Sequence, residues 1–282
     1  MKLLRFGDKG AEKPGIVDLN GNIRDLSSIV NDIDGGSLGA ASMQKIRSLN
    51  VEDLPLVGGN PRLGSCIAKP GKFLAIGLNF SDHAAETNSP IPKTPIVFYK
   101  ADTSMSGPND DVVQPKNSTK LDWEIEIAVV IGERLSYADE SEAARGIAGY
   151  CVVNDVSERA FQIDEGGSQW SKGKGCDSFG PTGPWLVTPD ELADVQNLGM
   201  WLDVNGERMQ TGNTSTMIFG CSFLVSYLSQ FMTLMPGDII TTGTPPGVAL
   251  GRTPHPWLKP GDVITLGIDG LGSQRQNVVA LG

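Results

Sequence analysis

The sequence predicts a β-rich α+β protein, and three observations support this prediction. Short apolar runs with the two-residue alternation of β-strands are frequent, whereas runs with helical spacing are few. The chain contains 35 glycines and 18 prolines, which favour turns and short strands over long helices. Asn-Gly pairs at residues 20–21 and 205–206 separate alternating runs, which is a strong signal for β-hairpins.

Length and charge limit the classes of function. A chain of 282 residues can form one large domain, or one domain with a small appendage. It carries 23 basic and 33 acidic residues, a net charge of −10, which argues against nucleic acid or an anionic membrane as the main partner. The most apolar long stretch, residues 219–235, contains several serines and is too polar to span a bilayer. We therefore expect a soluble protein, in which a basic local patch could still hold a small anion.

The four cysteines, Cys66, Cys151, Cys176 and Cys221, form no pair with the spacing of a metal or redox motif. They lie in apolar or glycine-rich surroundings, so we interpret them as reduced and mostly structural. The first six residues are too short for a signal peptide and lead directly into turn residues. These features predict a cytoplasmic protein.

Residues 1–66 are expected to form a small N-terminal domain, followed by a catalytic domain over residues 67–282. The first hairpin occupies residues 15–26, and the following residues combine scattered glycine and proline with a weak helical pattern. No pattern in this part indicates chemistry. We interpret it as an appendage for folding or dimerisation.

The first candidate for chemistry follows a predicted buried strand at residues 72–77. Ser81 or Asp82 can cap a helix that begins there. His83 and Glu86 are three residues apart and therefore share one face of that helix. Such a pair can act as a general base with its orienting carboxylate. A simple surface contact between the two side chains is the alternative interpretation.

A further strand is predicted at residues 95–100, and residues 120–132 then form a strand that becomes wholly apolar. Glu124 and Glu126 are two residues apart, so they project from the same face of this strand. Two neighbouring carboxylates beside a core repel each other and lose hydration, and a divalent cation removes both problems. The alternative is an exposed edge with two solvated glutamates.

A third acidic residue is predicted close to this pair. A short helix over residues 143–148 precedes an apolar strand, residues 149–155, that ends in Asp155. Three carboxylates with water make a hard oxygen site of the kind that Mg²⁺ or Mn²⁺ takes, and no cysteine–histidine set indicates zinc.

Basic residues follow this strand. Arg159, in a segment expected to form one or two helical turns up to Gln162, can hold a carboxylate with two hydrogen bonds. A glycine-rich run at residues 166–184 carries Lys172 and Lys174. Glycine-rich loops with lysines occur both as ordinary surface loops and as substrate clamps. The P-loop pattern of nucleotide-binding proteins is absent from the sequence.

The C-terminal part is expected to be mostly structural. The second hairpin spans residues 198–207, and residues 219–232 have helical spacing. Five side chains are expected to form a core-facing stripe on this helix: Phe219, Phe223, Tyr227, Leu228 and Phe231. A turn at 236–238 leads to a strand and to a tight polar loop that contains Thr242, Gly243 and Thr244.

Six segments in a fixed order resemble the fumarylacetoacetate hydrolase family, and they cover roughly residues 70–280. They are residues 77–86, 122–132, 149–157, 174–177, 205–207 and 236–245, with the sequences GLNFSDHAAE, DWEIEIAVVIG, GYCVVNDVS, KGCD, NGE and PGDIITTGTP. The resemblance implies a mixed β-sandwich and roll, usually a homodimer, with Mg²⁺ or Mn²⁺ as the cofactor.

The resemblance also implies roles for individual residues. The metal ligands of the family correspond to Glu124, Glu126 and Asp155, its catalytic pair to His83 and Glu86, and its site lysine to Lys174. Substrate contacts are expected from Arg159, Gln162, Thr242, Gly243 and Thr244. The sequence departs from the family pattern at Phe80, where tyrosine is usual, and at Glu158, where a small residue is common.

Three further stretches, residues 172–181, 227–232 and 267–276, are similar to the branch of the family that splits 2,4-diketo-3-deoxy sugar acids. This implies hydrolysis of a C–C bond in an anionic diketo acid, such as 2,4-diketo-3-deoxy-L-rhamnonate or -fuconate. The α-keto acid end would bind the metal, His83 would activate water, and Lys174 would stabilise the oxyanion. The products would be pyruvate and a short hydroxy acid.

Other activities on the same metal site stay open at this point. Oxaloacetate decarboxylation and tautomerisation need the cation but no water-activating base, and a ureidoglycolate lyase is a further alternative. A binding protein on a catalytically inactive enzyme scaffold is an alternative from another class.

Overall fold

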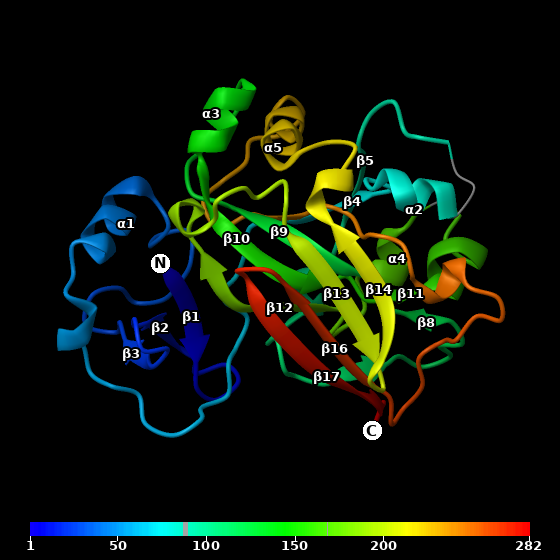
Figure 1. Ribbon diagram of the computed structural model, residues 1–282, viewed down its shortest axis with the longest axis horizontal. Coiled ribbons are helices and arrows are strands. Elements are labelled where there is room, and N and C mark those ends of the chain that lie inside the picture. Colours follow the sequence, from blue (N-terminus) through cyan, green and yellow to red (C-terminus); the bar gives the residue numbers. More distant parts are fainter. Residues whose placement is uncertain (87–89, 168) are drawn as a thin grey trace.

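The computed structural model describes residues 1–86, 90–167 and 169–282 (Figure 1). Its strands form three sheets with a few short helices, which confirms the β-rich α+β prediction. Residues 87–89, which follow the predicted helix that carries His83, lie outside the described residues. Among the residues that are described, no helix has both the length and the apolar character needed to cross a bilayer.

The largest sheet has ten strands. Nine of them are neighbours in the order β3–β2–β1–β12–β10–β9–β15–β4–β5, and β6 pairs with β12. The strands are β1 (Lys2–Phe6), β2 (Lys13–Val17), β3 (Ile23–Asp25), β4 (Phe73–Gly77), β5 (Ile96–Tyr99), β6 (Met105–Ser106), β9 (Ile125–Ile131), β10 (Ile147–Asn154), β12 (Gly180–Val187) and β15 (Ile239–Thr241).

A second sheet of five strands has the order β14–β13–β16–β17–β7, and a small sheet joins β11 to β8. The five-stranded sheet lies in front of β9 and β10 in the view of Figure 1. The strands are β7 (Val112–Gln114), β8 (Leu121–Asp122), β11 (Ser157–Glu158), β13 (Gly199–Val204), β14 (Glu207–Asn213), β16 (Val263–Ile268) and β17 (Gly272–Ala280).

Short helices connect the strands. They are α1 (Ala40–Arg47), α2 (Ser81–Glu86), α3 (Glu140–Arg145), α4 (Ser171–Lys174), α5 (Cys221–Ser229) and a π-helical turn over Ala160–Asp164. Helices α3 and α5 lie side by side beyond one end of β9 and β10 (Figure 1). The helix predicted to be capped by Ser81 or Asp82 is α2, and the capping assignment is wrong because both residues lie within the helix, which begins at Ser81.

Both predicted hairpins are confirmed. Strands β2 and β3 pair with Val17 opposite Ile23, and the Asn-Gly pair lies in the connection between them. In the second hairpin Val204 is opposite Glu207, so Asn205 and Gly206 alone form the turn. Both turn residues have positive φ angles, 51° and 81°, which is the backbone of the two-residue turns that match strand twist.

Several predicted boundaries in the middle of the chain are wrong. The helix expected at 143–148 is α3, Glu140–Arg145, because Asp139 caps it with a reciprocal hydrogen-bond pair to Glu142. The following strand therefore begins earlier, at Ile147. Before the π-helical turn, residues 157–158 are extended, because they pair with β8.

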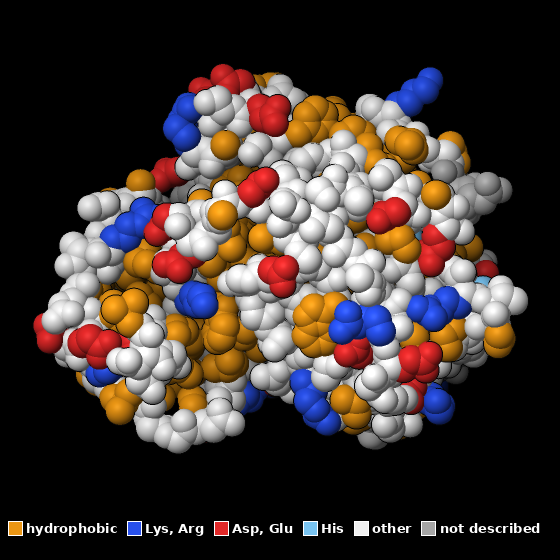
Figure 2. Space-filling view, viewed as in Figure 1, with side chains coloured by type: hydrophobic (Ala, Val, Ile, Leu, Met, Phe, Trp, Pro, Cys, Tyr) orange, Lys and Arg blue, Asp and Glu red, His pale blue; other side chains and the backbone are white. Residues whose placement is uncertain are grey.

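The core-facing stripe predicted on residues 219–232 is also wrong for Phe223 and Phe231, whereas Phe219 is partly buried against the core. Phe223 is 37% exposed and Phe231 is 67% exposed, whereas Leu224, Val225 and Leu228 are buried. The apolar residues of α5 continue around the helix, and the smaller ones face the core. The aromatic side chains stack along the outer face, and hydrophobic atoms gather there in the space-filling view (Figure 2).

Alternate residues of β9 contribute to two different hydrophobic clusters, so every residue of this strand is buried. Ile125, Ile127 and Val129 pack against the five-stranded sheet. Ala128 and Val130 face a second cluster that includes Leu3 and other side chains from the first 66 residues. The strands of those first residues extend the ten-stranded sheet through the pairing of β1 with β12.

Strand directions determine where the functional side chains meet. Strands β10 and β15 both run antiparallel to β9, and β4 runs parallel to β15. The carboxyl ends of β4, β10 and β15 therefore lie beside the beginning of β9. The residues that follow these three strands, 78, 155 and 242, are thereby brought close to Glu124 and Glu126.

Candidate active site

The backbone register brings together the three acidic residues proposed from the sequence. Asn154 is opposite Ile125, and one residue further the N–H of Asp155 donates to the carbonyl of Glu124 at 2.8 Å. Glu124 and Glu126 are two residues apart along the chain. All three side chains are buried, and one carboxylate oxygen from each lies within 4.8 Å of the others. This spacing suits a single small cation.

Three basic side chains contact this acidic trio. The Lys174 ammonium lies 2.5 Å from Glu124 Oε2 and 2.7 Å from Asp155 Oδ2. Arg159 Nη2 lies 2.6 Å from Glu124 Oε1, and Lys100 Nζ lies 2.6 Å from Asp155 Oδ1. Lys174 and Arg159 were expected here from the sequence, whereas Lys100 was not.

The charges in the site shift pKa values in opposite directions. Burial by itself raises the pKa of Glu124, but Lys174 and Arg159 outweigh it and lower the pKa to about 2. Glu126 has no such partner, so burial and the neighbouring Asp155 and Glu124 raise its pKa well above the usual value. The main partner of Glu126 is the backbone N–H of Gly243, which donates to Oε2 at 2.7 Å. The negative charge on Glu126 is thus the least compensated in the trio.

Lys100 is a buried lysine directly after β5. Its ammonium donates to Asp155 Oδ1 and to the carbonyl oxygen of Lys174. Burial lowers the pKa of Lys100, and the attraction of Asp155 offsets only part of this effect. By contrast, Asp155 and Glu124 outweigh the burial of Lys174 and raise its pKa. Lys100 therefore links a proposed metal ligand to the C-terminus of α4.

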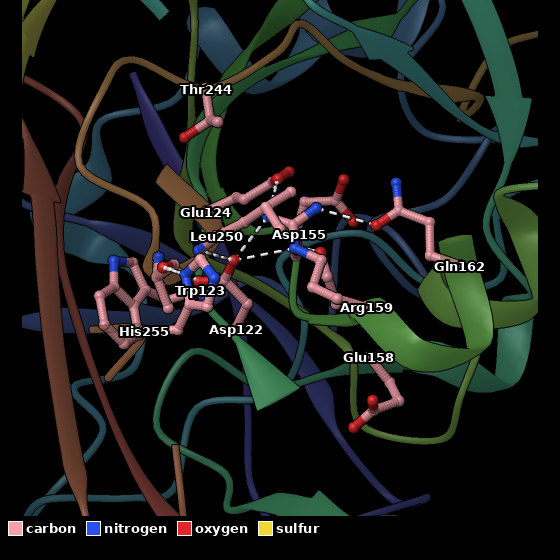
Figure 3. Close-up of polar contacts among 12 residues, drawn as sticks. Asp122, Trp123, Glu124, Asp155, Glu158, Arg159, Gln162, Thr244, Leu250 and His255 are labelled. Atoms are coloured by element: carbon pink, nitrogen blue, oxygen red, sulfur yellow. Dashed lines mark hydrogen bonds and ion pairs between the residues drawn. The ribbon is translucent and has the colours of Figure 1, made fainter. Parts of the chain in front are cut away.

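Asp122 is a second charged residue beside the site that sequence reasoning did not single out. Its Oδ2 accepts from Arg159 Nε at 2.8 Å and from the backbone N–H of Leu250 at 3.1 Å. Its Oδ1 accepts from the N–H of Ala249 at 2.7 Å. Figure 3 shows Asp122 between Arg159 and the loop that carries Leu250. Asp122 therefore fixes the orientation of the guanidinium group.

Arg159 is held at each of its three nitrogen atoms. Besides Asp122 and Glu124, it contacts Gln162 Oε1, 2.9 Å from Nη1. Glu158 instead points away from this group of side chains (Figure 3). It accepts hydrogen bonds from the backbone N–H groups of Lys120 and Ala160. The family departure at Glu158 therefore lies outside the site.

His83 and Glu86 form the contact expected from their spacing. His83 Nδ1 lies 3.0 Å from Glu86 Oε2, and both oxygens of Glu86 lie within 3.2 Å of the Gly247 N–H. The carboxylate favours the tautomer that carries the proton on Nδ1, so Nε2 is the nitrogen that can accept a proton. His255 is exposed, and its Nδ1 contacts the carbonyl of Ala249.

The polar loop after β15 is held mainly by the beginning of β9. The hydroxyl of Thr242 donates to the carbonyl of Ile127, and that of Thr244 donates to the carbonyl of Ile125. Gly243 and Thr244 line the cavity described below, whereas Thr242 does not. The backbone of Gly243 has a φ of 96°, and an added Cβ would lie 2.9 Å from Asn79 Cβ. Glycine at this position lets the N–H reach Glu126.

A cavity of about 190 Å³ lies among these groups, and Asp155 and Glu86 are not part of its lining. Its polar lining consists of His83, Glu124, Glu126, Arg159, Gln162, Lys174, Gly243 and Thr244. Its apolar lining consists of Ile76, Gly77, Leu78, Phe98, Ile163, Trp170 and Leu250. Phe80 is fully buried in the hydrophobic core and does not belong to this lining. The family departure at Phe80 therefore does not change the cavity wall directly.

The donor set fits a hard divalent cation. The trio supplies only carboxylate oxygens, which Mg²⁺ and Mn²⁺ prefer. Glu126 is buried with its charge only partly compensated, and a bound cation would remove this cost. None of the four cysteines or two histidines belongs to this cluster.

Comparisons with known proteins agree with this architecture. Residues 72–279 match the family described as "Fumarylacetoacetate (FAA) hydrolase C-terminal". A protein of Burkholderia ambifaria described as "Putative hydrolase" is 57% identical over 278 residues, which cover 98% of each chain.

Two solved structures are similar over the full length of both chains. One is a fumarylacetoacetate hydrolase from Exiguobacterium antarcticum, with 31% identity and a TM-score of 0.86. The other is a maleylpyruvate hydrolase from a Sphingobium species, in complex with Mn²⁺ and pyruvate, with 25% identity and a TM-score of 0.83.

Proposed function

Because the chain belongs to the fumarylacetoacetate hydrolase family, we propose that it hydrolyses the C3–C4 bond of a 2,4-diketo acid. The products are pyruvate and a short carboxylic acid. 2,4-Diketo-3-deoxy-L-rhamnonate and -fuconate are proposed substrates, with a hydroxy acid as the second product.

One observation carries this proposal: two members of the buried acidic trio, Glu124 and Glu126, line the same small cavity as His83. The trio suits the α-keto acid end of such a substrate. The His83–Glu86 pair supplies a base for water at the second carbonyl. A cavity of about 190 Å³ is smaller than the ~300–1,000 Å³ of pockets for drug-sized ligands, which favours a small substrate.

Glu124, Glu126 and Asp155 are the residues that would hold Mg²⁺ or Mn²⁺. Such an ion, when bound, supplies a Lewis acid for the α-keto acid end of the substrate. The Mn²⁺ in the structure of the maleylpyruvate hydrolase supports this assignment by similarity.

The His83–Glu86 pair would activate the water. Glu86, anchored by the Gly247 N–H, keeps the proton of the imidazole on Nδ1. Nε2 of His83 then removes a proton from water as the oxygen attacks the distal carbonyl. When the C–C bond breaks, its electron pair stays with the pyruvate fragment, which takes up a proton.

The basic residues prepare the site for an anion. Four buried carboxylates, those of the trio and Asp122, face the three cations Lys100, Lys174 and Arg159. With every group ionised, this leaves one net negative charge, and a divalent cation changes it to one net positive charge. An anionic diketo acid is then attracted. Two of the three donors of Lys174 contact carboxylates, so one is left for the oxyanion.

The experiment is a product assay on purified protein with Mg²⁺ or Mn²⁺. Candidate substrates are acetylpyruvate, 2,4-diketo-3-deoxy-L-rhamnonate, oxaloacetate and ureidoglycolate, and the assay measures pyruvate, CO₂ and glyoxylate separately. The proposal expects pyruvate and an equal amount of the second acid from a diketo acid. Turnover of oxaloacetate or ureidoglycolate alone would contradict it and would favour a decarboxylase or a lyase on the same site.

A further inference from the structure

We propose that the cavity selects diketo acids whose distal acyl group ends in an apolar, uncharged group, and that it rejects a second carboxylate at this end. This inference rests on the proposed function and specifies its substrate class. The selecting surface, called the apolar wall below, consists of six side chains: Ile76, Leu78, Phe98, Ile163, Trp170 and Leu250.

Trp170 is held firmly in this wall. An added Cβ on Gly77 would lie only 2.2 Å from Trp170 Cζ3, so the indole ring packs directly on the backbone of β4. The rings of Phe98 and Trp170 meet edge to face, with centroids 5.5 Å apart and an angle of 61° between their planes. Two neighbouring strands, β4 and β5, thus fix the indole at the cavity surface.

Phe98 connects the apolar wall to the charged end of the cavity. The Lys174 ammonium lies 5.5 Å from the centroid of the Phe98 ring. The wall therefore begins one side chain away from the group that contacts Glu124 and Asp155. A short diketo acid whose α-keto acid end lies at the acidic trio must place its distal group near this wall.

The two cations that line the cavity, Arg159 and Lys174, lie at its acidic end and contact carboxylates there. Each nitrogen atom of Arg159 has a partner in Asp122, Glu124 or Gln162, and Lys174 bridges two carboxylates. The lining that the structure describes contains no further lysine or arginine. A second substrate carboxylate beside the apolar wall would lose hydration without gaining a counter-charge, which is unfavourable. An alkyl or methyl end gains from the same burial.

Binding can be measured without any cleavage. The matched pair is 2-oxopentanoate and 2-oxoglutarate. At the end opposite the α-keto acid, the first carries a methyl group and the second a carboxylate. With Mg²⁺-loaded protein in calorimetric titrations, we expect 2-oxopentanoate to bind at least tenfold more tightly. In the series from pyruvate to 2-oxopentanoate, each methylene should improve affinity up to about fourfold, from ~0.8 kcal/mol per buried CH₂. Equal or tighter binding of 2-oxoglutarate would overturn the inference.

Kinetics with cleavable substrates give the second test. We expect kcat/KM for butanoylpyruvate to exceed that for succinylpyruvate at least a hundredfold, whereas a ratio near or below one would overturn the inference. Failure of the proposed function can be told apart from failure of this inference. If the protein is not a diketo acid hydrolase, butanoylpyruvate, succinylpyruvate and acetylpyruvate all stay intact. The affinities for 2-oxopentanoate and 2-oxoglutarate still test the selectivity of the cavity.

A designed change of specificity tests the wall itself. Ile163 lines the cavity and is 51% exposed, so an arginine there can be accommodated. Ile163→Arg should raise the succinylpyruvate-to-butanoylpyruvate ratio of kcat/KM at least tenfold. The control is Leu56→Arg, at a side chain that is 60% exposed and lies outside the cavity. An unchanged ratio in Ile163→Arg, or the same increase in the control, would contradict the role of the wall.

Discussion

The backbone N–H of Asp155 donates a 2.8 Å hydrogen bond to the carbonyl oxygen of Glu124. This bond continues the antiparallel pairing of β9 with β10 by one residue beyond the strands. It brings a carboxylate from the end of β10 beside two carboxylates at the beginning of β9. The proposed metal site is therefore built from the central strand pair of the large sheet, in which every residue is buried.

Lys174→Met should raise KM for a diketo acid and lower kcat. The substitution removes the ammonium that contacts Glu124 and Asp155 and that is proposed to stabilise the oxyanion. A decrease in kcat/KM of about 10²–10³ is expected from steady-state kinetics. Lys172→Met is the matched control, because Lys172 is exposed two residues earlier on α4. Unchanged kinetics of the Lys174 variant would remove this residue from the mechanism.

His83→Ala should reduce C–C bond hydrolysis by about 10²–10⁴, the usual contribution of a general base. Oxaloacetate decarboxylation, if the protein has it, needs no water-activating base and should persist. Parallel assays of pyruvate from a diketo acid and of CO₂ from oxaloacetate separate the two. His255→Ala, at the exposed second histidine, is the control. Full hydrolase activity in the His83 variant would contradict the proposed water activation.

Lys100→Met should destabilise the protein and weaken metal binding together. Removing one member of a buried ion pair leaves Asp155 Oδ1 without its partner and typically costs about 3–5 kcal/mol in unfolding free energy. The change also frees the Lys174 carbonyl from its donor. Denaturant unfolding and Mn²⁺ titration measure the two effects. Lys259→Met, at a side chain that is 75% exposed, should change neither quantity. Wild-type stability and Mn²⁺ affinity in the Lys100 variant would contradict the proposal that Lys100 links Asp155 to α4.

Asp122→Asn should lower kcat/KM by about 10–100-fold while Mn²⁺ binding changes little. The amide keeps the shape of the carboxylate, but its NH₂ group faces N–H donors from Arg159 and from the backbone. The guanidinium of Arg159 then loses its fixed orientation. Loss of a residue that orients a functional group in this way typically lowers activity about 10–100-fold. Asp102→Asn, at an exposed position, serves as the control. An unaffected kcat/KM would show that Asp122 has only a structural role.

Local periodicity indicated that the acidic trio could meet, and the resemblance to the family favoured a metal site over an exposed edge. Glu124 and Glu126 share a face because strand side chains alternate, and Asp155 follows an apolar strand. The same alternation places Asp122 two residues before Glu124, so this signal was present in the sequence. Its partners in the 249–250 loop depend on a contact across more than 120 residues, which no local pattern contains.

Other features could not be predicted because they depend on packing. Lys100 ends an apolar strand, where a lysine usually reaches solvent, and only the fold turns it toward Asp155. On α5 both faces are apolar, so spacing alone could not decide whether the aromatic or the smaller residues face the core. The smaller residues pack there, and Phe231 stays exposed.

The account depends most directly on one divalent ion binding to the acidic trio. Metal-stripped protein should bind one Mn²⁺ per chain in a calorimetric or electron paramagnetic resonance titration. Glu126→Gln keeps the size of the side chain but removes the charge, and it should weaken binding at least tenfold, whereas Glu133→Gln, outside the trio, should leave the affinity unchanged. Equal Mn²⁺ affinity in the wild type and in Glu126→Gln would contradict the proposed site.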